Sequence, residues 1–267
     1  RSRGSRASDV RRMSEPEPAR MPRLELPRIV FFGRTTEEYA GMWNISIPDL
    51  AGRTILDCPC GPANFIAGCR AAGVRATGVD PMLALPADEI ERRGVDDIVD
   101  TMAAIAASDA GLASEDPEAW ERDKRRALAT FLEDLRRHGP DGANADERYV
   151  AGSLPDLPFE DRSFDVVLSG HLLFTYASVE DGGLVEARAS LDLDFHLAAV
   201  DELARVARHE VRLFPAVTMT SGAGGPHPWA ASVRDRLEKL GFRVRTEDVD
   251  YDEGVSRNDA LMVANRF

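Results

Sequence analysis

Lysine is nearly absent from this chain. Only Lys124 and Lys239 occur in 267 residues, and arginine supplies the rest of the 33 basic side chains. Aspartate and glutamate number 46, so the formal net charge is −13. Neutralising a nucleic-acid backbone requires a basic face, and this balance argues against such a partner. An acidic, lysine-poor surface suits a high-salt cytoplasm and favours a halophilic source.

Long apolar runs are missing as well. No stretch approaches the roughly 18 apolar residues that a membrane-spanning helix needs, and the chain does not start with a signal-peptide pattern. We therefore expect a cytoplasmic protein without a membrane partner. Residues 1–23 contain mainly Arg, Ser, Glu and Pro and predict a disordered tail, so that the folded domain comprises residues 24–267.

Cysteine is scarce, with Cys58, Cys60 and Cys69 only. A structural zinc site needs four ligands, and no cluster of His or Cys supplies the remainder. We expect no metal site, and we interpret the three cysteines as small apolar side chains in a tightly packed region.

Residues 54–72 predict a strand, a tight turn and a helix. Ile55 and Leu56 end an apolar run, Gly61-Pro62 breaks it, and residues 64–72 carry apolar side chains at helical spacing. In open α/β sheets, ligands bind over the carboxyl ends of such strands. The next strand, 76–79, ends in Asp80, about 20 positions after the turn, where a carboxylate can accept both hydroxyls of a ribose.

The turn itself lacks the glycines of a dinucleotide site. Gly61 is its only glycine, whereas a pyrophosphate needs Gly-x-Gly-x-x-Gly, and no Gly-Lys-Ser/Thr follows to make a Walker loop. Asp57, at the end of the strand, would repel phosphate but attract an ammonium or a sulfonium. A ligand with adenine, ribose and a cationic amino-acid tail meets these constraints.

Two stretches resemble the class I S-adenosylmethionine-dependent methyltransferases. Motif I of that family runs Asp/Glu-x-Gly-x-Gly-x-Gly; Asp57 matches its acidic position and Gly61 its central glycine, while Pro59 and Ala63 depart from it. Proline has no N–H, so Pro59 cannot donate to a methionine carboxylate. Residues 152–167 resemble the family stretch Gly-Asp-Ala-x-x-Leu-Pro-Phe-x-Asp-x-Ser-Phe-Asp-x-Val over many consecutive positions.

The resemblance implies S-adenosylmethionine as cofactor. Asp80 would hold the ribose hydroxyls, and Asp57 would face the methionine amino group directly or through water. Where the family has an acidic residue that binds adenine, this chain has Ser153, so we expect recognition to depend also on the backbone at Leu154. The remaining predicted cofactor contacts are Cys58, Pro59, Cys60, Gly61, Pro81 and Ser169.

The loop after the strand 164–169 supplies the catalytic candidates. In the resembled family this loop passes below the transferable methyl group. His171 is the best candidate for a proton acceptor, because histidine titrates near neutral pH; the alternative is that it packs or caps the following helix. Tyr176 is a second catalytic candidate. Tyr39 and Phe174 are candidate substrate contacts, although Tyr39 packing on the sheet is equally open.

The resemblance and the apolar pattern together predict the fold. We expect a doubly wound α/β domain with a mostly parallel seven-stranded sheet whose last strand is antiparallel. Residues 82–147 form a segment far longer than an ordinary connection and are interpreted as a helical insertion that caps the active site. The further predicted elements are strands 148–152, 210–215, 242–249 and 259–265, the last two forming a hairpin, and helices 87–93, 97–108, 116–138, 195–208 and 229–240.

The predicted function is methyl transfer to an unidentified acceptor, with a small molecule as the default. The Asn-Pro-Pro-Tyr signature of amino-group methylation is absent, since Ser169-Gly170-His171-Leu172 stands in its place. Two principal alternatives stay open at this point: a module that binds S-adenosylmethionine without catalysis, and a nicotinamide-dependent oxidoreductase. Transfer of another part of a sulfonium cofactor is a third.

Overall fold

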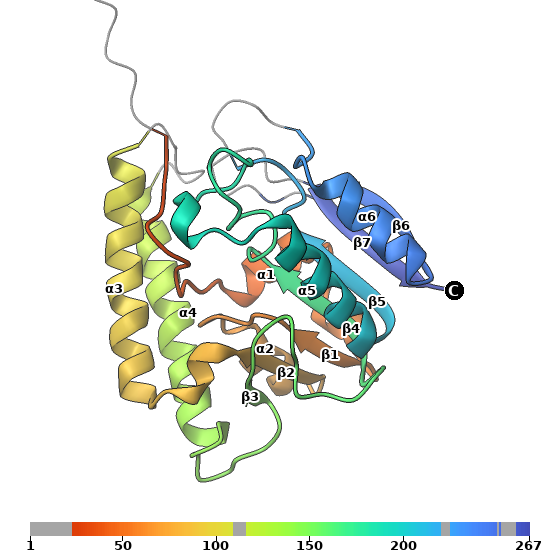
Figure 1. Cartoon of the computed structure of the whole chain (residues 1–267). Helices are drawn as coiled ribbons and strands as arrows, with labels where there is room; N and C mark the ends of the chain where they lie inside the picture. Colours follow the sequence, from red (N-terminus) through yellow and green to blue (C-terminus); the bar gives the residue numbers. More distant parts are fainter. Residues whose placement is uncertain (1–22, 109–115, 220–224, 250, 252–259) are drawn as a thin grey trace, which may run out of the picture.

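A computed structural model describes residues 23–108, 116–219, 225–249, 251 and 260–267 (Figure 1). The predicted tail, 1–23, therefore lies almost entirely outside the described residues. The described chain forms one seven-stranded sheet with helices on both of its faces. Among the helices described, none is both long and apolar enough to cross a membrane.

The strand order is β3-β2-β1-β4-β5-β7-β6. The five strands from β3 to β5 are parallel to one another, and β7 runs antiparallel to both β5 and β6. This order confirms the predicted doubly wound sheet and its antiparallel last strand. The strands are β1 Thr54–Asp57, β2 Arg75–Asp80, β3 Tyr149–Ala151, β4 Phe164–Gly170, β5 Ala207–Phe214, β6 Phe242–Asp248 and β7 Ala260–Arg266.

The residues that the structure describes include six α-helices, of which α3 packs on α4 and the other five cover the two faces of the sheet. The central strands are buried on both sides: in β4, Val167 belongs to one hydrophobic cluster and Val166 and Leu168 to the other. The first cluster is covered by α5 and α6, and the second by α1, α2 and α4. The helices are α1 Thr36–Trp43, α2 Phe65–Ala71, α3 Ala87–Ala106, α4 Pro117–His138, α5 Leu193–Val206 and α6 Ala230–Lys239.

The region 82–147 differs in detail from the prediction. The helices expected at 87–93 and 97–108 are one continuous helix, α3. Gly94 lies in its middle because α4 packs against that point: a Cβ there would lie 2.8 Å from Leu128 Cδ1. Most of α4 is a core helix rather than a cap, since Phe131 is fully buried and contacts Tyr149 of β3 at 5.5 Å between ring centroids.

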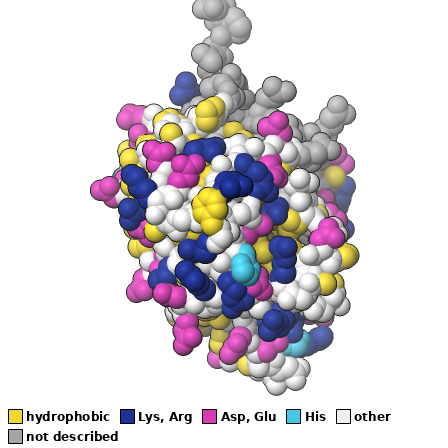
Figure 2. Space-filling view, turned by 90° about the vertical axis from the view of Figure 1, so that its right-hand side faces the viewer, with side chains coloured by type: hydrophobic (Ala, Val, Ile, Leu, Met, Phe, Trp, Pro, Cys, Tyr) yellow, Lys and Arg dark blue, Asp and Glu magenta, His cyan; other side chains and the backbone are white. Residues whose placement is uncertain are grey.

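The acidic excess is not spread evenly over the surface. Figure 2 shows the face that carries α6 and the edge strand β6, where Lys and Arg side chains gather between acidic ones. Arg236 of α6 pairs with Asp201 at 2.5 Å, and Arg245 of β6 pairs with Glu247 at 2.5 Å. At least two arginines of these elements are therefore neutralised locally by ion pairs.

Two buried histidines support the loop that follows β4. The backbone N–H of Phe174 donates to His196 Nε2 at 2.8 Å, and the Phe174 ring lies 5.0 Å from the ring of His227. His227 Nδ1 accepts from the N–H of Trp229 at 3.1 Å. Burial lowers the pKa of His196, and burial together with His196 lowers the pKa of His227 to about 4. The native fold therefore favours both rings in their neutral form.

We predict that replacing His227→Asn makes the protein less sensitive to acid. A histidine whose pKa falls from 6.5 to about 4 on folding costs stability as the pH drops below 6.5, amounting to about 2 kcal/mol between pH 7.5 and pH 5. Urea unfolding at these two pH values should show a smaller loss for the variant than for the wild type. The exposed His209 provides a matched control, His209→Asn, and an equal loss in His227→Asn and wild type would contradict the prediction.

Candidate active site

A cavity of about 480 Å³ opens at the carboxyl ends of the central strands. Its walls come from the loops after β1, β2, β3 and β4, from α3, and from residues 24–34, which precede α1. We call residues 24–34 the strap. The volume lies in the range of about 300–1,000 Å³ that ligand pockets usually occupy.

The loop after β1 is bent onto the end of β2. The N–H of Cys60 donates to the Val79 carbonyl at 3.0 Å, and the N–H of Gly61 donates to Asp80 Oδ2 at 3.1 Å. Gly61 has φ +50°, a left-handed conformation that glycine adopts without a steric penalty. Cys58, Pro59, Cys60 and Gly61 all line the cavity, as predicted for a loop beneath a ligand.

Asp80 is the carboxylate at the centre of this arrangement. It lines the cavity, is 5% exposed, and its Oδ1 accepts from the N–H of Met82 at 2.9 Å. Burial raises its pKa to about 6, against the opposing effect of the Met82 and Gly61 N–H groups. Pro81 follows it in the cavity wall, and so do Ser153 and Leu154 from the loop after β3.

Asp57 lies at the end of β1 and is fully buried, but it does not itself line the cavity. Neither carboxyl oxygen makes a hydrogen bond of normal geometry within the described chain. Burial raises its pKa to about 8; the Tyr39 hydroxyl opposes this rise, the charge of Asp80 adds to it, and Arg34 opposes it. A cation placed near this carboxyl would favour its charged form.

Tyr39 and Arg34 lie on the strap side of the loop after β1. The Tyr39 ring stacks on Phe65 of α2 at 4.6 Å between ring centroids, and the side chain also lines the cavity, so its contact with substrate stays a prediction. Arg34 was missed from the sequence, where no motif marks it. It lines the cavity and lies close enough to Asp57 to lower the pKa of that carboxyl. The neighbouring Gly33 is packed so tightly that a Cβ there would lie 2.2 Å from the Pro62 carbonyl oxygen.

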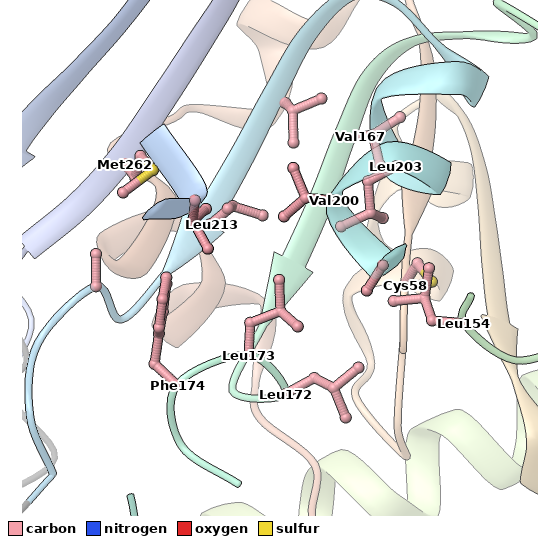
Figure 3. Packing of buried hydrophobic residues seen from close by; sticks show 14 of the residues in the cluster. Cys58, Leu154, Val167, Leu172, Leu173, Phe174, Val200, Leu203, Leu213 and Met262 are labelled. Carbon is pink, nitrogen blue, oxygen red and sulfur yellow. The ribbon is translucent and has the colours of Figure 1, made fainter. Parts of the chain in front are cut away.

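The loop after β4 turns sharply, and this decides which of its side chains reach the cavity. His171 and Phe174 have φ of +52° and +67°. His171 and Tyr176 line the cavity, together with Leu172 and Thr175. Phe174 does not: it is fully buried against His196 and His227, so its predicted contact with substrate is not supported by its position. Figure 3 shows Leu172, Leu173 and Phe174 on this loop, within the first hydrophobic cluster.

Three further buried hydroxyls belong to this region. Ser169, a predicted cofactor contact, is 1% exposed and lies behind the cavity rather than in its wall. Thr101 of α3 and Thr175 line the cavity, and within the described chain the side-chain oxygens of all three have no hydrogen-bond partner. Thr101 and Thr175 were not predicted, because a lone threonine carries no sequence signal. Among the described residues, no cluster of His, Cys, Asp and Glu could hold a metal ion.

Comparison with known proteins gives a family match for part of this chain. Residues 126–214 match the family model described as "Methyltransferase domain". The matched segment runs from α4 to the end of β5 and includes the stretch 152–167. This third of the chain is similar to methyltransferase domains. The match agrees with the family resemblance at residues 152–167, whereas residues 57–61 lie outside the matched segment.

Solved structures similar to this chain are distant in sequence, and no curated protein matches it. Magnesium protoporphyrin IX methyltransferase from Synechocystis PCC 6803, solved with bound SAM, is 15% identical over 87% of this chain and 78% of that chain, with a TM-score of 0.46. A SAM-dependent methyltransferase from Methanosarcina mazei is 12% identical over 83% of this chain and 96% of that chain, with a TM-score of 0.43.

The strap is fastened to α3 by one buried carboxylate. Asp97, fully buried, accepts from the N–H of Phe31 at 2.6 Å and from Arg93 Nε at 3.0 Å, and it pairs with Arg28 at 2.5 Å. At the other side of the cavity, the Tyr176 hydroxyl donates to the Val30 carbonyl at 3.3 Å. The strap therefore spans the cavity between α3 and the loop after β4.

We predict that Asp97→Asn loosens the strap. The substitution removes a buried charge that binds two arginines and a backbone N–H, and it should lower the free energy of unfolding by about 2–3 kcal/mol. Backbone amides of residues 26–34 should exchange with deuterium faster than in the wild type. The neighbouring Asp100→Asn is the control, because Asp100 is 68% exposed and its 3.4 Å ion pair with Arg28 should contribute less than about 0.5 kcal/mol. Equal exchange in both variants would contradict the role of Asp97.

Proposed function

We propose that the protein binds S-adenosylmethionine in this cavity and transfers its methyl group to a small-molecule acceptor. The observation that carries the proposal is a pair of buried carboxyls, Asp57 and Asp80, at the ends of neighbouring strands on either side of the loop after β1. Burial raises the pKa of both groups, so the site favours a ligand that presents hydroxyls to one carboxyl and a positive charge to the other.

The adenosyl half of the cofactor fits the β2–β3 side of the cavity. Each Asp80 oxygen already accepts one backbone N–H, and its remaining lone pairs can accept the two ribose hydroxyls. We place the adenine near Pro81, Ser153 and Leu154, where the Ser153 hydroxyl and the Leu154 backbone would provide polar contacts. This assignment keeps every adenosine contact predicted from the sequence.

The amino-acid half fits the loop after β1. Asp57 would attract the methionine ammonium, directly or through the Tyr39 hydroxyl. We assign the carboxylate to Arg34, because Pro59 has no N–H to offer and the Arg34 guanidinium lies in the same wall of the cavity. Cys58, Cys60 and Gly61 would then form the floor beneath the tail.

Methyl transfer requires chiefly an in-line approach of the acceptor to the sulfonium methyl carbon. We propose His171, which lines the cavity, as the group that takes a proton from the acceptor when the acceptor carries one. The Tyr176 hydroxyl bonds to the backbone of Val30, so we assign Tyr176 to holding the strap; a catalytic role would require that bond to open.

The nicotinamide alternative is disfavoured by the loop after β1, where a single glycine and two buried carboxyls leave no site for a pyrophosphate. The non-catalytic alternative is disfavoured by the volume of the cavity, which extends well beyond the residues assigned to the cofactor. A cytoplasmic location accompanies the proposal as a prediction from composition alone.

We predict that the protein binds S-adenosylhomocysteine in calorimetric titration and that Asp80→Asn weakens this binding. Losing a charged acceptor for the ribose should cost about 1.5–3 kcal/mol, or roughly ten- to hundredfold in affinity. The exposed Asp156→Asn serves as the control and should bind like the wild type. NADH should not compete, and a folded Asp80→Asn variant with unaltered affinity would remove Asp80 from the site.

We predict that cofactor binding releases a proton below pH 8. With a pKa of about 8, Asp57 is mostly protonated at pH 7 in the free protein, and a bound cation lowers this pKa. Affinity should therefore rise about fivefold between pH 7 and pH 8 and level off above about pH 9, at about tenfold the value at pH 7. Calorimetry in buffers with different ionisation enthalpies counts the released protons. The Asp57→Asn variant should bind the cofactor more weakly, and its affinity should depend less on pH. The exposed Asp49→Asn variant is the control and should behave like the wild type. A wild-type dependence of affinity on pH in Asp57→Asn would refute the assignment.

A further inference from the structure

Part of the cavity wall is apolar and lies outside the residues assigned to the cofactor. This part comes from the strap, from the loop after β4, from the segment that leads into α5 and from the segment after β5. We call the space along it the acceptor chamber and define it by Leu24, Leu26, Leu172, Leu184, Phe195 and Met219. All six side chains belong to, or pack against, the first hydrophobic cluster.

The acceptor chamber carries no charge among the described residues. The charged side chains that line the whole cavity are Arg34, Asp80 and Arg93. The first two belong to the proposed cofactor site, and Arg93 donates to the buried Asp97. A charged acceptor would lose its hydration in the chamber without gaining an opposite charge, and this is strongly unfavourable. The chamber therefore selects against charged molecules.

One polar group of the chamber wall points to the chemistry of the acceptor. The Thr175 side chain is 4% exposed, and its hydroxyl has no hydrogen-bond partner within the described chain although it lines the cavity. Buried hydroxyls are nearly always hydrogen-bonded, so an orphaned one in a cavity wall is a place for a ligand atom. His171 lines the same cavity from four residues earlier on this loop.

The strap limits the size of the acceptor. The N–H of Leu26 donates to the Leu184 carbonyl at 2.6 Å, and the N–H of Glu186 donates to the Leu26 carbonyl at 3.0 Å. These bonds join the strap to the far wall of the acceptor chamber. A side chain of a folded protein or a nucleotide within a polymer would have to break them to enter, whereas a free small molecule can lie beneath the strap.

From these features we infer that the acceptor is a small, uncharged and mainly apolar molecule whose nucleophile is an alcoholic or phenolic hydroxyl. This inference rests on the proposed function. The hydroxyl oxygen forms a bond to the methyl carbon, the S–CH3 bond breaks with its electron pair returning to sulfur, and the cofactor leaves as a neutral thioether. The hydroxyl proton passes to the ring of His171, and Thr175 holds the oxygen.

The test is calorimetric titration of a series of para-alkylphenols of increasing chain length, in the presence of S-adenosylhomocysteine. Each added methylene should improve affinity about threefold to fourfold. The same phenols with a carboxylate at the end of the chain should bind far more weakly or not at all. In parallel, tritiated S-adenosylmethionine should label the neutral phenols as methyl ethers.

Two variants make the test specific. Thr175→Val keeps the size of the side chain and should weaken phenols about fivefold, while alkylbenzenes without the hydroxyl should bind as they do to the wild type. Leu172→Asp should abolish binding of the alkyl series and keep the affinity for S-adenosylhomocysteine, with Leu172→Met as its control.

Equal binding of neutral and carboxylated phenols, or an affinity that does not change with chain length, would overturn the chamber assignment. Unchanged binding of phenols to Thr175→Val would overturn the role of its hydroxyl. Failure of S-adenosylhomocysteine to bind, with alkylphenols still bound in its absence, would instead refute the proposed function and leave the apolar chamber standing.

Discussion

The hydrogen bonds between one carboxylate and two backbone N–H groups organise this site. Asp80 accepts from Gly61 in the loop after β1 and from Met82 in the short 3-10 helix after β2. The two loops, which come from neighbouring parallel strands, are thereby fixed relative to each other. Because the carboxylate is buried, the same bonds that position the loops also offset part of the cost of keeping it charged.

Asp57 has no comparable compensation. Its oxygens lack well-formed hydrogen bonds in the described chain, and burial raises its pKa to about 8. Tyr39 and Arg34 offset only part of the cost of ionising this carboxyl, and a structure retains such a group most readily where a ligand supplies a further interaction. The two carboxyls therefore make the two ends of the site different. In the proposed function, the Asp80 end suits hydroxyl groups and the Asp57 end suits a positive charge.

The strap turns an open crevice into a chamber. Segments far apart in the sequence meet along it: Asp97 of α3 binds its middle, and Leu184 pairs with its start. A second ion pair, between the buried Lys124 of α4 and the partly exposed Glu38 of α1, lies beside it, with the Lys124 ammonium 5.3 Å from the Phe32 ring centroid. One of only two lysines in the chain is thus used where a compact cation fits between a carboxylate and aromatic rings.

The local sequence was sufficient to predict those parts of the fold and the site that are formed by residues close together in the chain. The strand–turn–helix at Asp57–Gly61, the position of Asp80 after the next strand and the antiparallel hairpin at the end are all set by short-range patterns of apolar, glycine and acidic residues, and each was predicted. The resemblance at residues 152–167 could likewise be found from the sequence, because this stretch is one continuous run that leads from the end of β3 through a turn into β4.

The tertiary structure alone decided which side chains face the cavity. Phe174 and Leu172 are both apolar residues of the same loop, yet only Leu172 lines the cavity, since positive φ angles at His171 and Phe174 turn the loop and buried histidines receive the Phe174 ring. Arg34 belongs to the site because it lies near Asp57, which is distant in the chain. Gly94 lies within one continuous helix, where it packs against Leu128 of α4. Periodicity records which residues avoid water, but the direction of a side chain in a loop depends on long-range packing, and that information is not local.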